Sequence, residues 1–105
     1  MPSAARGVAE VRLSAAARPD IVRIDELFAA EFGKDVADEY TRGLKVAFDL
    51  LKRHPRAGAA HSEYGAGVRC KAHRGHRIIY RIEGKTVLVQ RILHRSQHVL
   101  KHLPR

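Results

Sequence analysis

The spacing of the apolar residues changes once along this chain, and that change limits the fold more than any other feature. Between residues 21 and 51 large apolar side chains recur every three or four positions, as they do on one face of an α-helix. Between residues 68 and 93 they recur at every second position, as in a β-strand. Because both apolar stripes must be buried, the pattern predicts helices packed on one face of a sheet, an α+β fold.

Two helices are predicted in the first half of the chain. The first begins at Ser14 or at Pro19 and ends at Gly33, a residue that favours helix C-termini. The second covers residues 35–53 and stops before Pro55, which cannot continue a helix. Because only about two residues separate the helices, we expect an antiparallel helical hairpin.

Four strands are predicted around this hairpin, in the order β-α-α-β-β-β. They cover residues 8–13, 68–73, 77–82 and 86–94. Tight turns at Arg74-Gly75 and at residues 83–85 join the last three strands into a meander, so the small sheet is mainly antiparallel. The last strand is apolar on both alternations and should therefore be central, with the first strand beside it. Residues 97–103 form a short C-terminal helix or tail, with Ser96 as its N-cap.

Length and composition predict one domain, residues 1–105, with residues 1–7 frayed. Cys70 is the only cysteine, so no internal disulfide forms and a reducing compartment such as the cytoplasm is expected. No apolar run approaches the roughly 20 residues that span a bilayer, so we expect no membrane association. No cofactor is expected.

The positive charge is confined to the last two-fifths of the chain. Residues 1–64 contain ten Lys and Arg residues and ten Asp and Glu residues, which cancel. Residues 65–105 contain ten Lys and Arg residues against Glu83 alone, so they carry the whole net charge of +9. A field of one sign on part of a small domain attracts an anionic partner, either nucleic acid or an acidic protein surface.

The segment from His94 to His98, HRSQH, permits three interpretations. Two histidines four residues apart can bind zinc on a helix, but Arg95 replaces the glutamate of the H-E-x-x-H signature and would repel a metal ion, so we expect no metal. A metal-free ribonuclease is possible if His94, Arg95 and His98 converge with Arg69 and Lys71. A cationic binding surface is the third interpretation and requires no proton transfer.

Three ordered segments carry a family resemblance: VRLSAAARPDI, DEYTRGLKVAFDLLKRHPRAG and GVRCKAHRGHRIIYRIEGKTVLVQRILHRSQHV. They correspond to an opening strand and helix, to a second helix that ends in a P…G turn, and to an (I/V)-(I/F)-Y-R strand followed by a V-x-R-(V/I)-L-H strand. In these features the chain resembles the RelE/ParE superfamily of bacterial toxins, and its ParE branch in particular. The resemblance implies the toxin of a type II toxin–antitoxin pair.

The resemblance also implies a target. ParE-type toxins act on DNA gyrase, whereas RelE-type toxins are ribonucleases that cut messenger RNA on the ribosome. We expect a ParE-like gyrase inhibitor that binds rather than a metal-independent endoribonuclease, because the C-terminal tyrosine of RelE-like enzymes is absent here. The residues expected to contact the target are Arg81, Arg91, His94, Arg95 and His98. The alternatives are a RelE-like ribosome-dependent ribonuclease and a non-toxic co-repressor.

The resemblance further implies a cognate antitoxin that neutralises the toxin. We expect it to be short and acidic, with a ribbon-helix-helix DNA-binding N-terminus. The helical hairpin is neutral and amphipathic, so an antitoxin helix is expected to lie across it at Val22, Val46 and Leu50.

Overall fold

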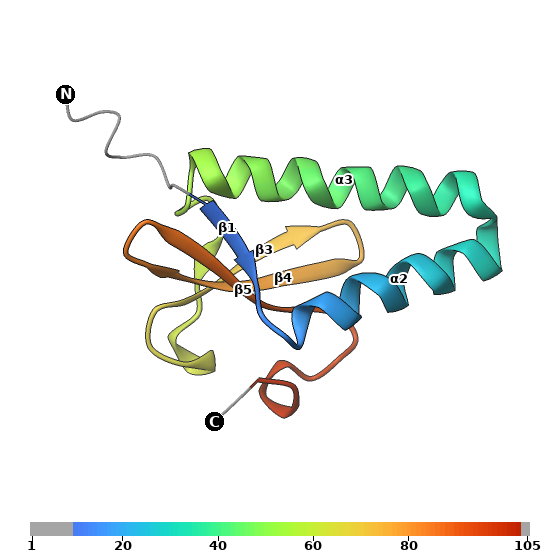
Figure 1. Cartoon of the computed structure of the whole chain (residues 1–105). Helices are drawn as coiled ribbons and strands as arrows, with labels where there is room; N and C mark the ends of the chain where they lie inside the picture. The colour runs from blue at the N-terminus through green and yellow to red at the C-terminus, as the bar shows by residue number, and fades with distance from the viewer. Residues whose placement is uncertain (1–9, 104–105) are drawn as a thin grey trace.

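Two antiparallel helices cover one face of a five-stranded sheet, and the C-terminal segment crosses the other face (Figure 1). This computed structural model describes residues 10–103. The elements are β1 (Glu10–Leu13), α2 (Ala17–Phe32), α3 (Lys34–Arg53), β2 (Ala59–Ala60), η1 (Ser62–Tyr64), β3 (Val68–His73), β4 (His76–Glu83), β5 (Thr86–His94) and η2 (Val99–Lys101). The predicted α+β fold is confirmed. The expected fraying of residues 1–7 and the start of the first strand lie outside the described residues.

The helical hairpin forms as predicted, with a connection of one residue. Helix α2 begins at Ala17, so Pro19 lies in its first turn, where its missing N–H costs nothing. Ser14 lies just before this turn and accepts a hydrogen bond from the Ala17 N–H at 3.0 Å, while its own hydroxyl donates to the Gln90 carbonyl at 2.7 Å. Gly33, at φ +93°, ends α2 and allows α3 to start at the next residue.

The strand order is β1-β5-β4-β3-β2, which confirms the central position of β5 and the place of β1 beside it. Strand β1 runs parallel to β5, and the other pairs are antiparallel. Strand β2 was not predicted, because its two alanines carry no strand signal. Gly58 allows this strand to approach β3, since a Cβ atom there would lie 2.6 Å from the Cys70 carbonyl oxygen.

A β-bulge in β5 decides which face of the sheet each of its apolar residues takes. Ile79 of β4 pairs with Arg91, but the next residue, Tyr80, pairs with Val89, so Gln90 is left over. The extra residue reverses the alternation of the side chains after it. Val89 and Ile92 therefore both face the helices, although they are three residues apart.

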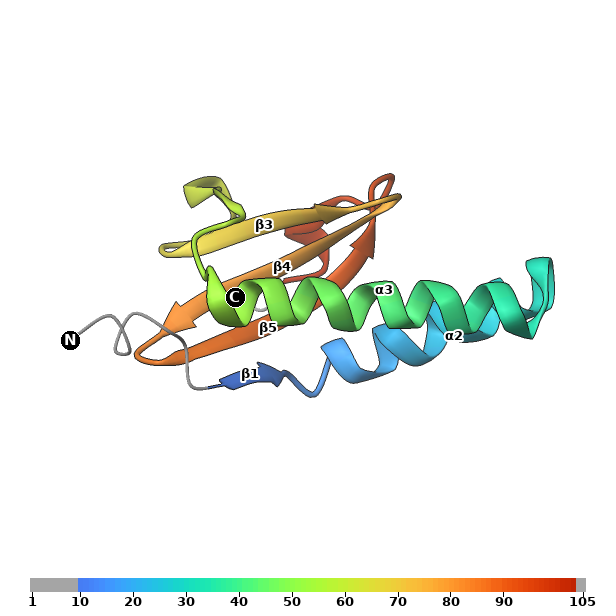
Figure 2. The ribbon, with the colours of Figure 1, turned by 90° about the horizontal axis from the view of Figure 1, so that it is seen from above.

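Each face of the sheet has its own apolar cluster. The inner face, covered by the helices, includes Ala17, Ile24, Tyr40, Leu44, Ala47, Leu51, Ile78, Tyr80, Val87, Val89 and Ile92. The outer face has a smaller cluster of Val68, Ile79, Leu93 and Val99, with Tyr64, Cys70 and Leu103 packed against it. Seen from above, the distal ends of α2 and α3 extend beyond the sheet (Figure 2). Within residues 10–103, no helix is both long and apolar enough to cross a membrane.

Of the two predicted forms of the C-terminal segment, helix or tail, the structure has the tail, and Ser96 is not a helix N-cap. The segment contains only a three-residue 3₁₀ turn, Val99–Lys101, with His98 at its N-cap position. The Ser96 hydroxyl instead bonds His94 Nδ1 at 2.8 Å. The reason is that arginine side chains of the sheet bond the carbonyls of this segment and hold its turns against the outer face.

Candidate functional site

A groove of about 570 Å³ lies where α2 extends past the end of the sheet. Its apolar lining includes Ile24, Leu27, Phe28 and Phe32, and its polar lining includes Arg23, Glu31, Arg74, His94 and Gln97. Leu27 is 62% exposed and Phe32 is 56% exposed, although both are large apolar side chains. An exposed apolar surface with a polar rim is typical of a partner-binding site.

Three histidines form a row across the sheet at the groove. His73, His76 and His94 are opposite one another on β3, β4 and β5. The Tyr40 hydroxyl lies 2.5 Å from His76 Nδ1 and donates to the His73 carbonyl at 3.2 Å. Burial, and then the nearby His94 and His73, lower the pKa of His76 below its ordinary value of 6.5. His76 is therefore a neutral hydrogen-bonding group under the groove at neutral pH.

Arg74 marks the rim of the groove at the β3–β4 turn, which forms where it was predicted. Its backbone has φ +54°, a conformation that side-chain-bearing residues rarely adopt. The guanidinium carbon lies 5.8 Å from the centroid of the Tyr40 ring, so the cation stacks over an aromatic face. The rim thus presents a cation above the apolar groove.

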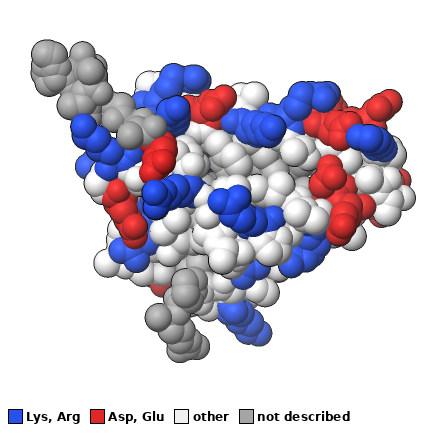
Figure 3. All heavy atoms as spheres, viewed as in Figure 1, with Lys and Arg blue, Asp and Glu red and all other residues white. Residues whose placement is uncertain are grey.

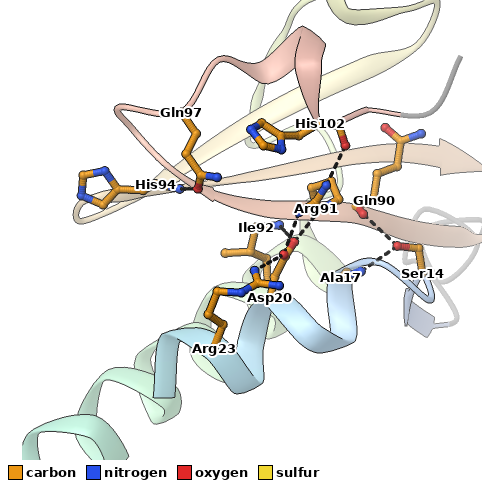
Figure 4. A network of polar contacts seen from close by, with 10 residues as sticks. All are labelled: Ser14, Ala17, Asp20, Arg23, Gln90, Arg91, Ile92, His94, Gln97 and His102. Carbon is orange, nitrogen blue, oxygen red and sulfur yellow. Dashed lines mark hydrogen bonds and ion pairs between the residues drawn. The ribbon is translucent and has the colours of Figure 1, made fainter. Parts of the chain in front are cut away.

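Asp20 joins α2 to β5 and is the most buried charged residue of the described chain, at 1% exposure. Strand β1 ends at Leu13, so beyond it the edge of β5 has no strand beside it. The Asp20 carboxylate takes that place: it accepts the Ile92 N–H at 2.9 Å and two hydrogen bonds from Arg91 at 2.8 and 2.9 Å (Figure 4). Burial by itself raises the pKa of Asp20, but the hydrogen bonds from Arg91 and Ile92 outweigh it and hold the pKa below its ordinary value.

Residues 95–103, here called the strap, lie along the outer face of the sheet. Arg77 Nη2 donates to the carbonyls of Arg95 at 3.2 Å and Gln97 at 2.7 Å, and Arg91 Nη1 donates to that of His102 at 2.8 Å. Val99, at 3% exposure, inserts into the outer cluster. The side chains that the strap exposes are Arg95, Ser96, His98, Leu100 and Lys101.

The prediction that Arg81, Arg91 and Arg95 form one cationic patch is wrong. Arg91 presents no free charge, because Asp20 pairs with it and the strap covers it. Arg81 lies opposite Leu88 and 3.9 Å from Glu83, whereas Arg95 is seven residues beyond Leu88, about 23 Å along the strand direction. On the face that Figure 3 shows, cations are interspersed with carboxylates. His94, Arg95 and His98 do remain close together, at the end of β5 and the start of the strap.

The residues expected for a ribonuclease do not all converge, because Arg69 and Lys71 lie apart from His94, Arg95 and His98. Arg69 donates from Nε to the Gly58 carbonyl at 2.9 Å and from Nη2 to that of Arg56 at 3.2 Å, so it fixes the loop before β3. It lies four residues from the histidine row, about 13 Å along β3, and β4 separates it from β5. Lys71 is half-buried on β3 and pairs with Ile78, which faces the helices, so it projects from the face of the sheet opposite the strap. No group of three His, Cys, Asp or Glu residues within residues 10–103 is placed to hold a metal ion.

The residues expected to bind the antitoxin lie on different sides of the hairpin. Val22 is exposed on α2, beside the flank of α3 that carries Thr41. Val46 and Leu50 share the opposite flank of α3 with Gly43, which packs against β3. The three residues therefore do not form one surface.

Sequence reasoning also missed residues that the structure brings into the site. Asp20 falls in the apolar stripe of α2, between Ala17 and Ile24, and a carboxylate at such a position signals a buried partner. The groove was not foreseen, because Leu27 and Phe32 belong to the same stripe and looked like ordinary core residues. Only the length of α2 relative to the sheet leaves them exposed.

Comparison with known proteins identifies the family. The family model "ParE toxin of type II toxin-antitoxin system, parDE" matches residues 11–99. The chain belongs to the ParE toxin family. It is 32% identical to Toxin ParE1 of Caulobacter vibrioides over 92 residues, which cover 88% of this chain and 95% of that protein. It is 34% identical to Toxin ParE1 of Mycobacterium tuberculosis over 92 residues, covering 87% and 94%.

A solved structure extends this similarity to the fold. A chain from the chromosomal ParDE toxin–antitoxin system of P. aeruginosa superposes with a TM-score of 0.71 at 18% identity, covering 81% of this chain and 94% of that one. The protein is thus a ParE-type toxin of a toxin–antitoxin system, with the ParE fold. Its groove and its strap are two candidate binding surfaces.

Proposed function

We propose that this ParE-type toxin inhibits DNA gyrase through its strap and is silenced by a cognate antitoxin that occupies the groove. The observation that supports gyrase inhibition through the strap is the composition of the strap. Arg95, His98 and Lys101 point into solvent there, and the sequence has no Asp or Glu after Glu83. A cationic segment of this kind suits an acidic protein surface or the phosphates of bound DNA.

The lining of the groove supports the proposal that an antitoxin binds there. Leu27 and Phe32 are large apolar side chains without a covering layer, which an amphipathic helix can bury with two or three apolar residues of its own. Arg74 and Arg23 line the same groove, so carboxylates beside those apolar residues would find partners. An acidic antitoxin segment has both features, and the groove replaces Val22, Val46 and Leu50 as its proposed site.

The arrangement of the cations favours binding over ribonuclease chemistry. Metal-free RNA cleavage needs a proton acceptor, a proton donor and cations around one phosphate. Arg69 is engaged by loop carbonyls and does not neighbour His94, and Arg91 is neutralised by Asp20. His94, Arg95 and His98 stay near one another, but Arg69 and Lys71 do not join them, so the cations expected around one phosphate are not assembled.

The test is a supercoiling assay with purified toxin, gyrase, relaxed plasmid and ATP, run beside an assay of messenger RNA cleavage on ribosomes. We expect supercoiling to stop and linear DNA to accumulate while the messenger RNA stays intact. The double variant Arg95→Gln/Lys101→Gln should raise the inhibitory concentration at least tenfold. Lys52→Gln/Arg53→Gln, which removes the same charge from the exposed end of α3, is the matched control and should inhibit like the parent.

Other outcomes overturn the proposal in different ways. Cut messenger RNA with unaffected gyrase would make the protein a ribonuclease. If both assays are negative and expression without antitoxin is harmless, the protein is a non-toxic co-repressor. Equal losses in the two double variants would mean that the inhibition depends on overall charge and not on the strap.

A further inference from the structure

We propose that Arg77 and Arg91 are positioning residues: they clamp the strap to the outer face of the sheet, so that Arg95, His98, Leu100 and Lys101 form a preformed contact surface. This inference rests on the proposed function, since it names how the target-binding segment is held. It also reverses the expected role of Arg91, from a residue that contacts the target to one that fixes the backbone beneath the contact surface.

The strap has little regular structure to hold it in place. Only Val99–Lys101 form a 3₁₀ turn, and the backbone hydrogen bonds within the strap and to His94 are those of tight turns: Gln97 N–H to His94, Lys101 N–H to His98 and His102 N–H to Val99. At its start the strap is also bonded through the side chains of His94, Ser96 and Gln97, and the Arg95 N–H donates to the Gly75 carbonyl at 2.9 Å. A segment of this kind frays unless other groups tie it down. Beyond Arg95, the ties to the sheet are the packing of Val99 and Leu103 on the outer cluster and three guanidinium-to-carbonyl hydrogen bonds.

A guanidinium group suits this task because it is planar and carries five donors with fixed directions. Arg77 uses Nη2 for two successive parts of the strap, the carbonyls of residues 95 and 97. Arg91 uses Nε and Nη2 for Asp20 and Nη1 for the His102 carbonyl. The buried carboxylate thus fixes the direction in which Arg91 offers its remaining donor, and it couples the first turn of α2 to the end of the strap.

Clamping decides which side chains face outward. With Val99 in the outer cluster, the adjacent Leu100 is 50% exposed and stands between His98 and Lys101. This pattern fits an acidic protein surface with an apolar recess for one leucine. Because the strap is already ordered before it meets a partner, binding does not have to bear the entropy of ordering it.

Arg77 provides the clean test, because both of its described hydrogen bonds go to strap carbonyls, whereas removing Arg91 would also leave the buried Asp20 without its partner. Arg77→Met keeps the packing of the aliphatic stem, Arg77→Lys keeps the charge without the planar fork, and Arg12→Met is the control at an exposed arginine of β1 that pairs with Glu10. Hydrogen exchange is read at the amides of Gln97, Lys101 and His102, and gyrase inhibition and thermal unfolding are measured in parallel.

We expect exchange of the strap amides in Arg77→Met to be at least tenfold faster, with exchange in β4 and β5 unchanged and gyrase inhibition at least tenfold weaker. Arg77→Lys should recover only part of the strap protection and part of the gyrase inhibition. Arg12→Met should match the parent in both measurements. Parental exchange rates of the strap in Arg77→Met would overturn the clamp, as would a loosened strap with undiminished inhibition. If Arg77→Met unfolds globally, Arg77→Lys decides by the same two readouts. If the parent does not inhibit gyrase, the proposed function fails, while the exchange data still decide whether the strap is clamped.

Discussion

The two faces of the sheet are built in different ways. On the inner face, two helices bury a continuous cluster of aliphatic and aromatic side chains that includes Tyr80 and Leu44. On the outer face, a much smaller cluster around Ile79 and Leu93 is covered by loops and by the strap, whose carbonyls bond arginine side chains. Apolar area therefore holds the helices, whereas the strap depends on a few directional hydrogen bonds as well.

This difference changes how the basic half of the chain is understood. Arg69, Arg77 and Arg91 each donate to backbone carbonyls of a loop or of the strap. These three arginines of the strands fix irregular backbone segments. Because they are engaged in this way, a count of the cations in the sequence overstates the positive charge that is available to a partner. At the C-terminal end of the part of the chain that the structure describes, the exposed cations are the smaller set in the strap, Arg95 and Lys101.

The largest expected effect on stability comes from Asp20 and Arg91, which connect helix α2 of the inner face to the strap of the outer face. Asp20→Ala removes the buried partner of Arg91 and the acceptor of the Ile92 N–H, and breaking such a pair costs about 3–5 kcal/mol of unfolding free energy. Arg23→Ala is the control, because Arg23 contacts the same carboxylate from an exposed position and should cost less than about 1 kcal/mol. Chemical denaturation measures both. Similar losses in the two variants would show that burial of Asp20 does not govern the strength of the network.

The next prediction compares the two faces directly through neighbouring residues. Ile78 and Ile79 are both fully buried, the first against the helices and the second in the outer cluster. Truncating either to alanine should cost about 2–5 kcal/mol. Hydrogen exchange should separate them, because Ile79→Ala removes a contact under the strap and Ile78→Ala does not. Equal protection of the strap in the two variants would contradict a separate role for the outer cluster.

The sequence predicts the inner face far better than the outer one. Periodic apolar residues such as Ile24 and Leu44 identified the helices, and the pattern of β5 identified a central strand, because burial of one stripe repeats along each element. The bulge at Gln90, the carboxylate of Asp20 and the clamp at Arg77 depend on single contacts between residues far apart in the chain. Such contacts produce no periodic pattern in the sequence. The sequence therefore does not distinguish Arg91 from an exposed surface cation.

The last and smallest effect distinguishes the two regions by pH. His76 and His73 at the groove have pKa values lowered by burial and neighbouring cationic groups, so the folded protein binds fewer protons there than the unfolded chain. Their contribution to stability is complete above pH 6.5 and is lost as pH falls from there toward the folded pKa, by at most about 1.4 kcal/mol per pH unit for each group. Asp20, with its pKa below 3.8, retains its contribution through this range and loses it only in stronger acid.

Unfolding measured by denaturant between pH 7.5 and 5 should therefore show a decline that His76→Gln makes shallower, with His73 responsible for part of the remainder. The strap should stay protected from exchange throughout that range, because the Arg77 hydrogen bonds to it involve no histidine and Arg91 keeps its ionised partner. Below about pH 4 the strap and the start of α2 should loosen together as Asp20 becomes protonated. If the strap loosened with the histidines near pH 6, the groove and the strap would be one cooperative unit, and a partner in the groove would then act directly on the contact surface at the C-terminus.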